Sequence, residues 1–430
     1  MISNDQMLAL VRIANLGGAE KLVLVGDRQQ LLSIDAGKSF AVTQAGGVTL
    51  ARMDENLRQR TPELRAVAAL TNQGKAGEAV RLLGAHVTET GDRIGEAARQ
   101  WLQLTPAERD ATMLLTSGRE TRAGLNQAIQ DGLKAEGSLK GEGLQLTVAD
   151  RVDRTREDLR YAHSYTPGLR LEVWSRLQSV GLERGDYRVA RVFGNGKVEL
   201  ERGGKRTKFD PQKLASGAKH DKLNLVATKD IRIHEGDKIR WTTNDKDRDL
   251  LNSALARVVS IDHRGVVFER ADQSGVRMEM GDPMLKRLDL AYALNMHMAQ
   301  GVTTDKGMVV MGSEERFLSN QRLFNVAVTR VRDAVSVITD DKDKLARQLD
   351  RTSGDKYSAL EEAGRLDVDK QRSAARDVGK PFDPGPIGDL SLANDKPTGP
   401  RQPDAKHRAS ETPVQHSTAP VPEKSKGLEL

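Results

Sequence analysis

The stretch Thr112–Gly118 reads TMLLTSG and predicts a strand that ends in a loop. A helical pattern follows the loop and carries Arg122, Leu125, Asn126 and Ile129. A short apolar run of this kind is typical of a strand that is buried on both faces of a parallel sheet. Because strand, loop and helix in this order are the repeating unit of such sheets, the stretch predicts an α/β protein.

The same alternation of predicted strands and helices appears on both sides of this stretch. Downstream, Gly307–Met311 and Ala334–Ile338 are predicted strands, and Glu314–Thr329 between them is mostly helical. Upstream, Lys21–Val25 (KLVLV) is a predicted buried strand, and the loop Gly26-Asp27 beyond its carboxyl end is where a parallel sheet binds a phosphate. A solvated turn explains that loop equally well. Apolar periodicity indicates further helices near residues 4–16, 61–83, 94–104 and 342–349, and a short strand near 48–50.

From residue 137 to about 284, short β-like pieces alternate with turns. Tyr187–Val192 and Val198–Glu201 flank the turn sequence FGNGK, which predicts a hairpin. We expect this segment to be an all-β insertion, folded as a small barrel. It is rich in Lys and Arg, which suits either a solvated surface or contact with a phosphate backbone.

Composition narrows the function classes. The 430 residues carry a net charge of +6 and no cysteine, so thiolate metal sites, cysteine nucleophiles and disulfides are excluded. The modest basic excess is compatible with nucleic acid but does not require it. No signal peptide or membrane-spanning stretch is evident, and we expect a cytoplasmic protein. Residues 351–430 form a tail that is predicted to be disordered from about 367, because large apolar side chains are few.

The sequence Gly37-Lys38-Ser39 resembles the end of a phosphate-binding P-loop. The P-loop pattern needs a glycine five residues before Gly37, and Leu32 stands there. The tripeptide also follows no predicted strand and opens no predicted helix. We therefore reject it as a P-loop, and no other P-loop pattern occurs in the chain.

Several separated segments, in order, resemble the motifs of superfamily-one DNA helicases. The matching segments are GDRQQ (26–30), ENLRQ (55–59), the strand and helix from Thr112 to Asn126, YALNMHMAQGVT (292–303) and NVAVTRVR (325–332). The resemblance implies RecA-like motor domains that couple ATP hydrolysis to movement along single-stranded DNA. Two further stretches, Tyr161–Tyr165 and Gly236–Asp245, resemble the helicase half of conjugative (MobF-type) relaxase–helicases.

The resemblance implies a role for individual residues. Arg58 and Arg330 would be catalytic, since both would approach the γ-phosphate, and arginine is suited to this by its planar, always charged fork. The residues implied to sense the nucleotide are Asp27, Gln30, Gln300 and Gly301. Those implied to contact DNA are Thr116, Asn126, His297 and Thr303. No residue is assigned to a metal.

The resemblance also implies a division into domains. Residues 1–45 would be the C-terminal remnant of a first motor domain. Residues 46–136 and 285–350 would form the second motor domain, and residues 137–284 would be the β insertion within it.

The sequence departs from the family pattern in two ways. Asn295-Met296 stands where the family usually has Thr-Val. The Walker A and Walker B motifs, which hold ATP and magnesium, are absent, and Met1 matches the methionine of the Walker B pattern D-E-A-x-M. The chain is thus expected to begin just after Walker B, to lack the magnesium ligands and to be inactive as an ATPase alone.

Three functions stay open. The chain is a helicase fragment that binds single-stranded DNA, a helicase half completed by an upstream chain that carries both Walker motifs, or a non-catalytic DNA-binding module. The sequence leaves ATPase activity and oligomeric state undecided.

Overall fold

The computed structural model describes residues 2–28, 37–51, 55–152, 154–215, 222–315 and 318–355. The chain divides into two units, 1–372 and 373–430, and every described residue belongs to the first. Of the tail predicted at 351–430, only 351–355 are described, so its predicted disorder lies outside the described residues.

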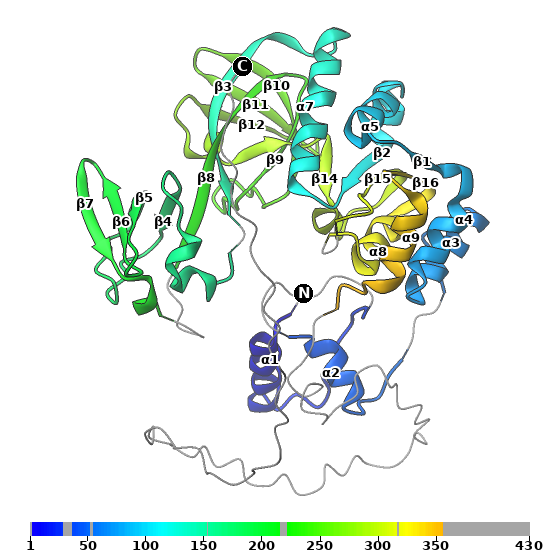
Figure 1. Ribbon diagram of the computed structural model, residues 1–430, viewed down its shortest axis with the longest axis horizontal. Helices are drawn as coiled ribbons and strands as arrows, with labels where there is room; N and C mark the ends of the chain where they lie inside the picture. The colour runs from blue at the N-terminus through cyan, green and yellow to red at the C-terminus, as the bar shows by residue number, and fades with distance from the viewer. Residues whose placement is uncertain are drawn as a thin grey trace, which may run out of the picture. The chain divides into compact units, whose positions relative to one another are not determined.

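Five strands form a parallel sheet in the order β1-β16-β15-β2-β14 (Figure 1). The strands predicted at 112–115, 307–311 and 334–338 are confirmed as parts of β2, β15 and β16, and the α/β class is confirmed with them. The bounds are β1 Val87–Glu89, β2 Thr112–Thr116, β14 Ala293–Asn295, β15 Thr304–Val310 and β16 Val331–Thr339.

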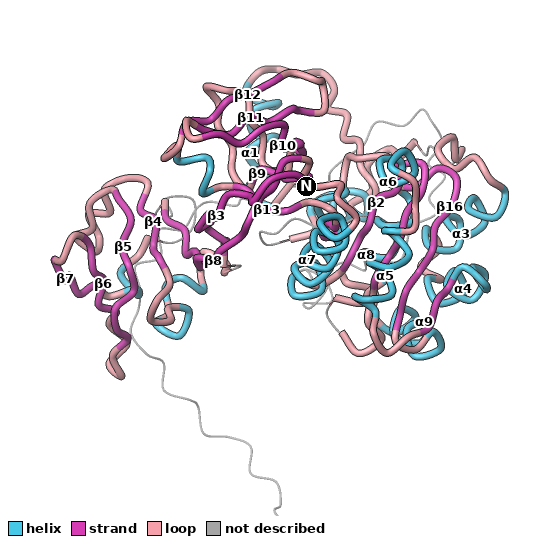
Figure 2. The backbone as a smooth tube through the Cα atoms, turned by 90° about the horizontal axis from the view of Figure 1, so that it is seen from above, coloured by secondary structure: helices cyan, strands magenta, loops and turns pink. Residues whose placement is uncertain are grey.

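Helices cover both faces of this sheet (Figure 2). Successive strand residues point to opposite faces, so Leu114 packs with one group of helices and Leu115 with the other. The first group is α5 (Arg93–Leu102) and α7 (Arg119–Ala135). The second group is α3 (Pro62–Asn72), α4 (Ala76–Leu83), α8 (Gln321–Thr329) and α9 (Lys342–Arg351).

Side-chain caps fix where several of these helices begin. Thr61 accepts a hydrogen bond from the amide of Leu64, and Pro62 occupies the first helical position. Thr105 forms a capping box with Glu108 and opens the short helix α6 (Pro106–Ala111).

The segment from 137 to 284 is all-β, as predicted, but it is divided between two antiparallel sheets rather than closed into one small barrel. The predicted hairpin is confirmed as β5 paired with β6. The six-stranded sheet has the order β3 (Lys140–Arg151), β8 (Leu223–Glu235), β4 (Arg170–Val173), β5 (Gly185–Val192), β6 (Val198–Arg202) and β7 (Lys205–Phe209). The five-stranded sheet has the order β12 (Gly275–Glu279), β11 (Gly265–Arg270), β10 (Leu255–Asp262), β9 (Lys238–Trp241) and β13 (Leu288–Leu290).

The long strand β8 joins two parts of the six-stranded sheet. Its first residues pair with β4, and the remainder pairs with β3. The strands β4 to β7 enclose a core of their own, whereas the five-stranded sheet shares its core with α5 and α7 of the parallel sheet. The α/β pattern was expected to resume at Leu288, but β13 pairs antiparallel with β9, and the chain rejoins the parallel sheet only at β14.

The N-terminal region contains two helices, α1 (Asn4–Leu16) and α2 (Ser39–Ala45). Ser3 caps α1 through a capping box with Gln6. Helix α2 begins at Ser39, so the expectation that Gly37-Lys38-Ser39 opens no helix is wrong. Its rejection as a P-loop still rests on Leu32 in place of glycine.

The strand predicted at Lys21–Val25 is not formed, and this prediction is wrong. Val23 and Val25 are 68% and 77% exposed. A parallel strand needs hydrogen-bonding neighbours, and no strand precedes β1 within the described residues. The strand predicted near 48–50 is absent as well.

Short 3-10 helices join several of these elements. Their bounds are η1 Gly84–His86, η2 Asp158–Arg160, η3 Ala162–Ser164, η4 Pro211–Lys213, η6 Pro283–Lys286 and η7 Met296–Ala299. None of the helices within the described ranges has both the length and the apolar character needed to span a membrane.

Candidate functional site

Arg330 is the centre of the site at the amino edge of the parallel sheet. It caps the end of α8, immediately before β16, and only 4% of its surface is exposed. Within the described structure, its Nε and Nη2 atoms have no hydrogen-bond partner. Burial and the nearby charge of Arg58 lower the pKa of Arg330, and the carboxylate of Asp27 opposes this shift. A buried guanidinium with unused donors is costly by itself, so the pocket around it suits an anion.

The segment around Arg58 is bound to the backbone on both sides of Arg330. The Arg58 Nη1 atom donates to the Thr329 carbonyl at 2.7 Å. The Gln59 Nε2 atom donates to the Val331 carbonyl, also at 2.7 Å. These two contacts hold the second arginine beside the first, although their positions in sequence are far apart.

The neighbouring residues extend this attachment. The Arg60 amide donates to the Arg332 carbonyl at 2.7 Å, and the Thr61 hydroxyl donates to the Asp333 carbonyl at 3.0 Å. The segment 58–61 thus lies along the first residues of β16, in front of α3.

A hollow of about 410 Å³ lies next to these arginines. Its charge is mixed, since Arg60 is within 3.5 Å of both Asp305 and Asp333, and Arg332 is 3.3 Å from Asp305. Its lining residues are Leu57, Arg58, Arg60, Thr303 and Arg332.

Asp27 approaches the same site from the N-terminal region. Arg322 on α8 donates a hydrogen bond to the carbonyl of Arg28, which brings the loop that begins at Gly26 to α8. The structure therefore brings Asp27, Arg58 and Arg330 together. Gln30, the other predicted sensor in this loop, lies outside the described residues.

Comparison with known proteins agrees with the motifs. The family described as "AAA domain" matches residues 1–92. The multifunctional conjugation protein TraI of Escherichia coli is 24% identical over 392 residues, covering 80% of this chain and 22% of TraI. The conjugal transfer protein TraA of Agrobacterium fabrum is 24% identical over 377 residues, covering 85% of this chain and 26% of TraA. A crystal structure of Pif1 helicase from Bacteroides in complex with ADP-AlF3 and single-stranded DNA has a TM-score of 0.35 and 12% identity, over 72% of this chain and 55% of that one.

The chain is thus similar over most of its length to conjugation proteins, 80% of it to TraI and 85% of it to TraA. It spans about a fifth to a quarter of the length of the curated relatives it matches, 22% of TraI and 26% of TraA.

The motif at 292–303 connects the two edges of the parallel sheet. Strand β14 ends at Asn295 on the carboxyl edge, and β15 begins at Thr304 on the amino edge. Between them, η7 crosses the face covered by α8, where Met296 and Ala299 are buried. Gly301 has a φ of 94°, a conformation that favours glycine and lets the chain turn towards Thr304.

The predicted residues of this motif are therefore separated. Thr303 lines the hollow beside Arg58, and His297 is exposed on η7. Gln300 and Gly301 lie between them, and Gln300 is half-buried. The structure thus places Thr303 with the arginines rather than with the other residues predicted to contact DNA.

Thr116 and Asn126 are buried near the opposite edge of the sheet. The Asn126 amide donates to the carbonyls of Leu290 and Ala293, and its oxygen accepts from the Ala293 amide at 2.8 Å. Neither side chain presents exposed polar surface. Their placement supports a role in fixing β14, and direct contact with DNA stays a prediction.

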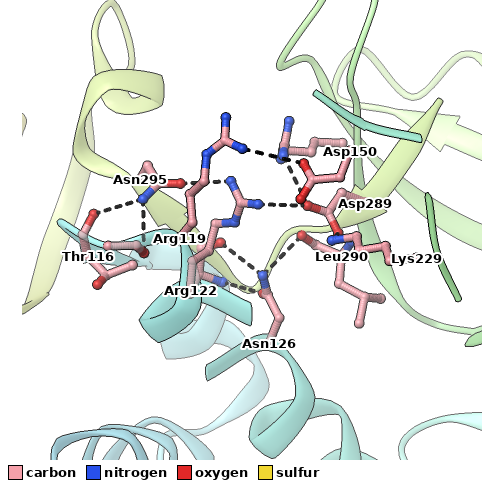
Figure 3. A network of polar contacts seen from close by, with 12 residues as sticks. Thr116, Arg119, Arg122, Asn126, Asp150, Lys229, Asp289, Leu290 and Asn295 are labelled. Carbon is pink, nitrogen blue, oxygen red and sulfur yellow. Dashed lines mark hydrogen bonds and ion pairs between the residues drawn. The ribbon is translucent and has the colours of Figure 1, made fainter. Parts of the chain in front are cut away.

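The sequence did not indicate the residues that hold the candidate site residues in place. One of them is Gln59, next to Arg58, whose side-chain amide is buried. Asp289 carried no signal in the sequence, although it is buried and bound by Arg122 and Lys229 (Figure 3). Arg240 binds it as well. Across the described ranges, no three His, Asp or Glu side chains converge in a way that could hold a metal ion.

Proposed function

We propose that this chain supplies the second motor domain and the β insertion of an ATP-dependent helicase that moves along single-stranded DNA during conjugative transfer. The observation that carries this proposal is the buried Arg330, with two donor atoms unused and Arg58 held beside it. Such an arrangement fits the terminal phosphate of a nucleotide.

Arg330 and Arg58 would act by stabilising charge on the transferring phosphoryl group. Phosphoryl transfer is catalysed mainly by positioning and positive charge, and a finger arginine contributes about 10³–10⁵ in rate. Asp27, Gln30, Gln300 and Gly301 are proposed to respond to the nucleotide. ATP with magnesium would supply the phosphoryl group and its bridging cation.

The residues at hand fit the phosphate but not the metal. The chain has no P-loop and no D-E-A-x-M sequence, and no metal-binding group occurs among the described residues. We therefore propose that the chain alone does not hydrolyse ATP, and that a polypeptide carrying both Walker motifs completes the site. The cytoplasmic location inferred from the sequence agrees with this need for ATP.

Nucleotide turnover tests the proposal. The purified chain is expected to show no ATP hydrolysis stimulated by single-stranded DNA. Addition of a polypeptide that carries the Walker motifs should produce turnover, and Arg330→Ala should abolish it. Hydrolysis by the chain alone that is lost in Arg330→Ala would contradict the proposed dependence on a partner, while hydrolysis that survives Arg330→Ala in the completed enzyme would contradict the role of Arg330.

A second function, DNA binding without nucleotide, is favoured by one feature of the six-stranded sheet. A hollow of about 400 Å³ is lined by Trp174, which is 55% exposed, and by Arg154, Arg156 and Lys222. An exposed aromatic ring among cations suits stacking of a base and contact with its phosphates. This function predicts binding of single-stranded DNA that weakens steeply with salt and does not respond to ATP.

A further inference from the structure

Asp289 lies where the three sheets of the protein meet. It belongs to β13 of the five-stranded sheet, and Arg240 on the neighbouring strand β9 donates to it at 3.0 Å. Lys229 on β8 of the six-stranded sheet donates to it at 2.7 Å. Arg122 on α7, which packs on the parallel sheet, donates at 3.1 Å. One carboxylate thus binds a cation from each of the three sheet systems (Figure 3).

Arg122 links Asp289 to Asn295. Its Nη2 atom binds Asp289, while its Nη1 atom donates to the Asn295 Oδ1 atom at 2.7 Å. The guanidinium is 3% exposed, so water does not compete for either bond. A planar fork can span two acceptors at once, whereas a lysine ammonium at the same place has no such geometry.

Asn295 completes the path to the carboxyl edge of the parallel sheet. Its amide nitrogen donates to the carbonyls of Thr116, Ser117 and Gly118, at 3.5, 3.3 and 3.1 Å. An asparagine is suited to this position because its two ends accept and donate separately. Threonine, the usual residue of the family motif here, is shorter and has one hydroxyl in place of these two ends.

The charge balance shows why Asp289 is central. Its own burial raises the pKa of Asp289, but Lys229, Arg240 and Arg122 together outweigh this and hold the pKa below the usual value. Burial and the like charge of Arg122 lower the pKa of Arg240, and the Asp289 carboxylate is the main charge that opposes this, with Asp150 as a weaker one. The network therefore depends on this carboxylate, and the Nε atoms of Arg122 and Arg240 have no partner within the described structure. A change at Asp289 is thus expected to shift both arginines.

We propose that Asp289 and Arg122 are positioning residues that couple the two antiparallel sheets to the loop 116–118 through Asn295. A shift of either antiparallel sheet is transmitted to the loop after β2, where the motifs predict contact with DNA. This inference rests on the proposed function for its consequence in DNA binding, but the coupling itself is a property of the chain alone.

Arg122→Lys separates coupling from simple charge balance. It keeps the positive charge but cannot bridge Asp289 and Asn295. We expect the free energy of unfolding to fall, because the buried Asn295 Oδ1 atom loses its donor, and amide hydrogen exchange in the segment 112–122 to speed up more than in the rest of the described chain. Asn295→Asp keeps an acceptor for Arg122 and loses the donors to the loop, so it should produce the same local exchange. The double variant should show no more than the larger single effect, because both changes break one path.

Both measurements use the full chain. Hydrogen exchange measures the coupling, and binding of an oligothymidylate of about 20 nucleotides measures its consequence for DNA binding. We expect the dissociation constant of Arg122→Lys and of Asp289→Asn to rise about fivefold or more. Lys134→Met, which removes an exposed cation from the same helix α7, is the matched control and should change neither. If Asp289→Asn does not fold, Arg122→Lys and Asn295→Thr carry the test.

The outcomes are distinct. Unchanged exchange at 112–122 in Arg122→Lys and Asn295→Asp overturns the coupling. Faster exchange with unchanged oligothymidylate binding leaves the coupling in place and overturns its consequence for DNA. No binding of the oligothymidylate by the wild type, at any salt concentration, counts against the proposed function, while the exchange measurement still decides the coupling.

Discussion

Arg58 donates a hydrogen bond to the carbonyl of Thr329, and this 2.7 Å contact holds two guanidinium groups near each other at the end of α8. Like charges repel, and the effect is visible at Arg330, where burial first and Arg58 second lower the pKa. Folding thus assembles an unfavourable pair of charges around donor atoms that are left unused. Such an arrangement is stabilised when an anion enters.

The first prediction concerns stability without an anion. Replacing Arg330 with methionine keeps an unbranched side chain and removes a buried charge that burial and Arg58 disfavour. We expect Arg330→Met to raise the free energy of unfolding by about 1 kcal/mol, as measured by urea denaturation. Arg332→Met, at a half-exposed side chain that pairs with Asp305, is the control and should change little. A clear loss of stability in Arg330→Met would show that the guanidinium stabilises the fold through contacts of its own.

The second prediction concerns the anion itself. Inorganic pyrophosphate should raise the Tm of the wild type, because a ligand that binds only the folded state stabilises it. The shift should be lost in Arg330→Met and reduced in Arg58→Met. Sodium chloride at equal ionic strength controls for general salt effects. An equal pyrophosphate shift in all three proteins would place the anion elsewhere.

The third prediction concerns Gln59, which is buried and donates to the carbonyls of Val331 and Thr329. Gln59→Ala leaves a buried carbonyl without its partner and opens a small cavity. We expect it to lower the free energy of unfolding by about 1–3 kcal/mol. Gln127→Ala, at an exposed position of α7, should cost far less in the same urea experiment. Equal losses in the two variants would mean that the Gln59 contacts do not hold the segment 58–61.

The central strands β2, β15 and β16 of the parallel sheet could be predicted because each contains a mostly apolar, largely buried run. The edge strands β1 and β14 have only three residues each and were not predicted. The same signal failed at Lys21–Val25, since an apolar run shows that a segment can be buried but not that a neighbouring strand will pair with it. The single barrel failed for a related reason. The local alternation of apolar and polar residues indicates each strand, but it does not show that β9 to β13 pair with one another and that β3 to β8 pair separately.

The candidate site could be predicted where a motif names a residue type with one chemical use. Arg58 and Arg330 lie close together, as the motifs require, and Asp27 lies near them. The position of Asn126 could not be predicted in this way. A polar residue after a strand can contact either a ligand or the backbone. The contacts of Asn126 with Leu290 and Ala293 depend on tertiary packing, which the periodicity of the sequence does not show.

The last prediction uses two buried carboxyl groups whose pKa values shift in opposite directions. Burial raises the pKa of Asp237, although Tyr292, the His234 amide and Gln130 donate to it and oppose the shift. Asp289 has a lowered pKa because its three cations outweigh its burial. An aspartate in the unfolded chain titrates near pH 3.9. The effect of Asp237 on stability is therefore expected above this pH, and the loss of the Asp289 effect below it.

The signs follow from proton binding in each state. Above about pH 3.9, folded Asp237 binds a proton more readily than the unfolded chain does, so acidification from neutral pH stabilises the wild type relative to Asp237→Asn. Below about pH 3.9, folded Asp289 resists protonation, so the advantage of the wild type over Asp289→Asn is full at neutral pH and declines as the pH falls through its folded pKa. Urea denaturation of the three proteins between about pH 7 and pH 3 measures both differences. If the Asp289→Asn difference is the same at both ends of this range, the carboxylate is not stabilised by its three cations, and the junction of the three sheets must be held by packing alone.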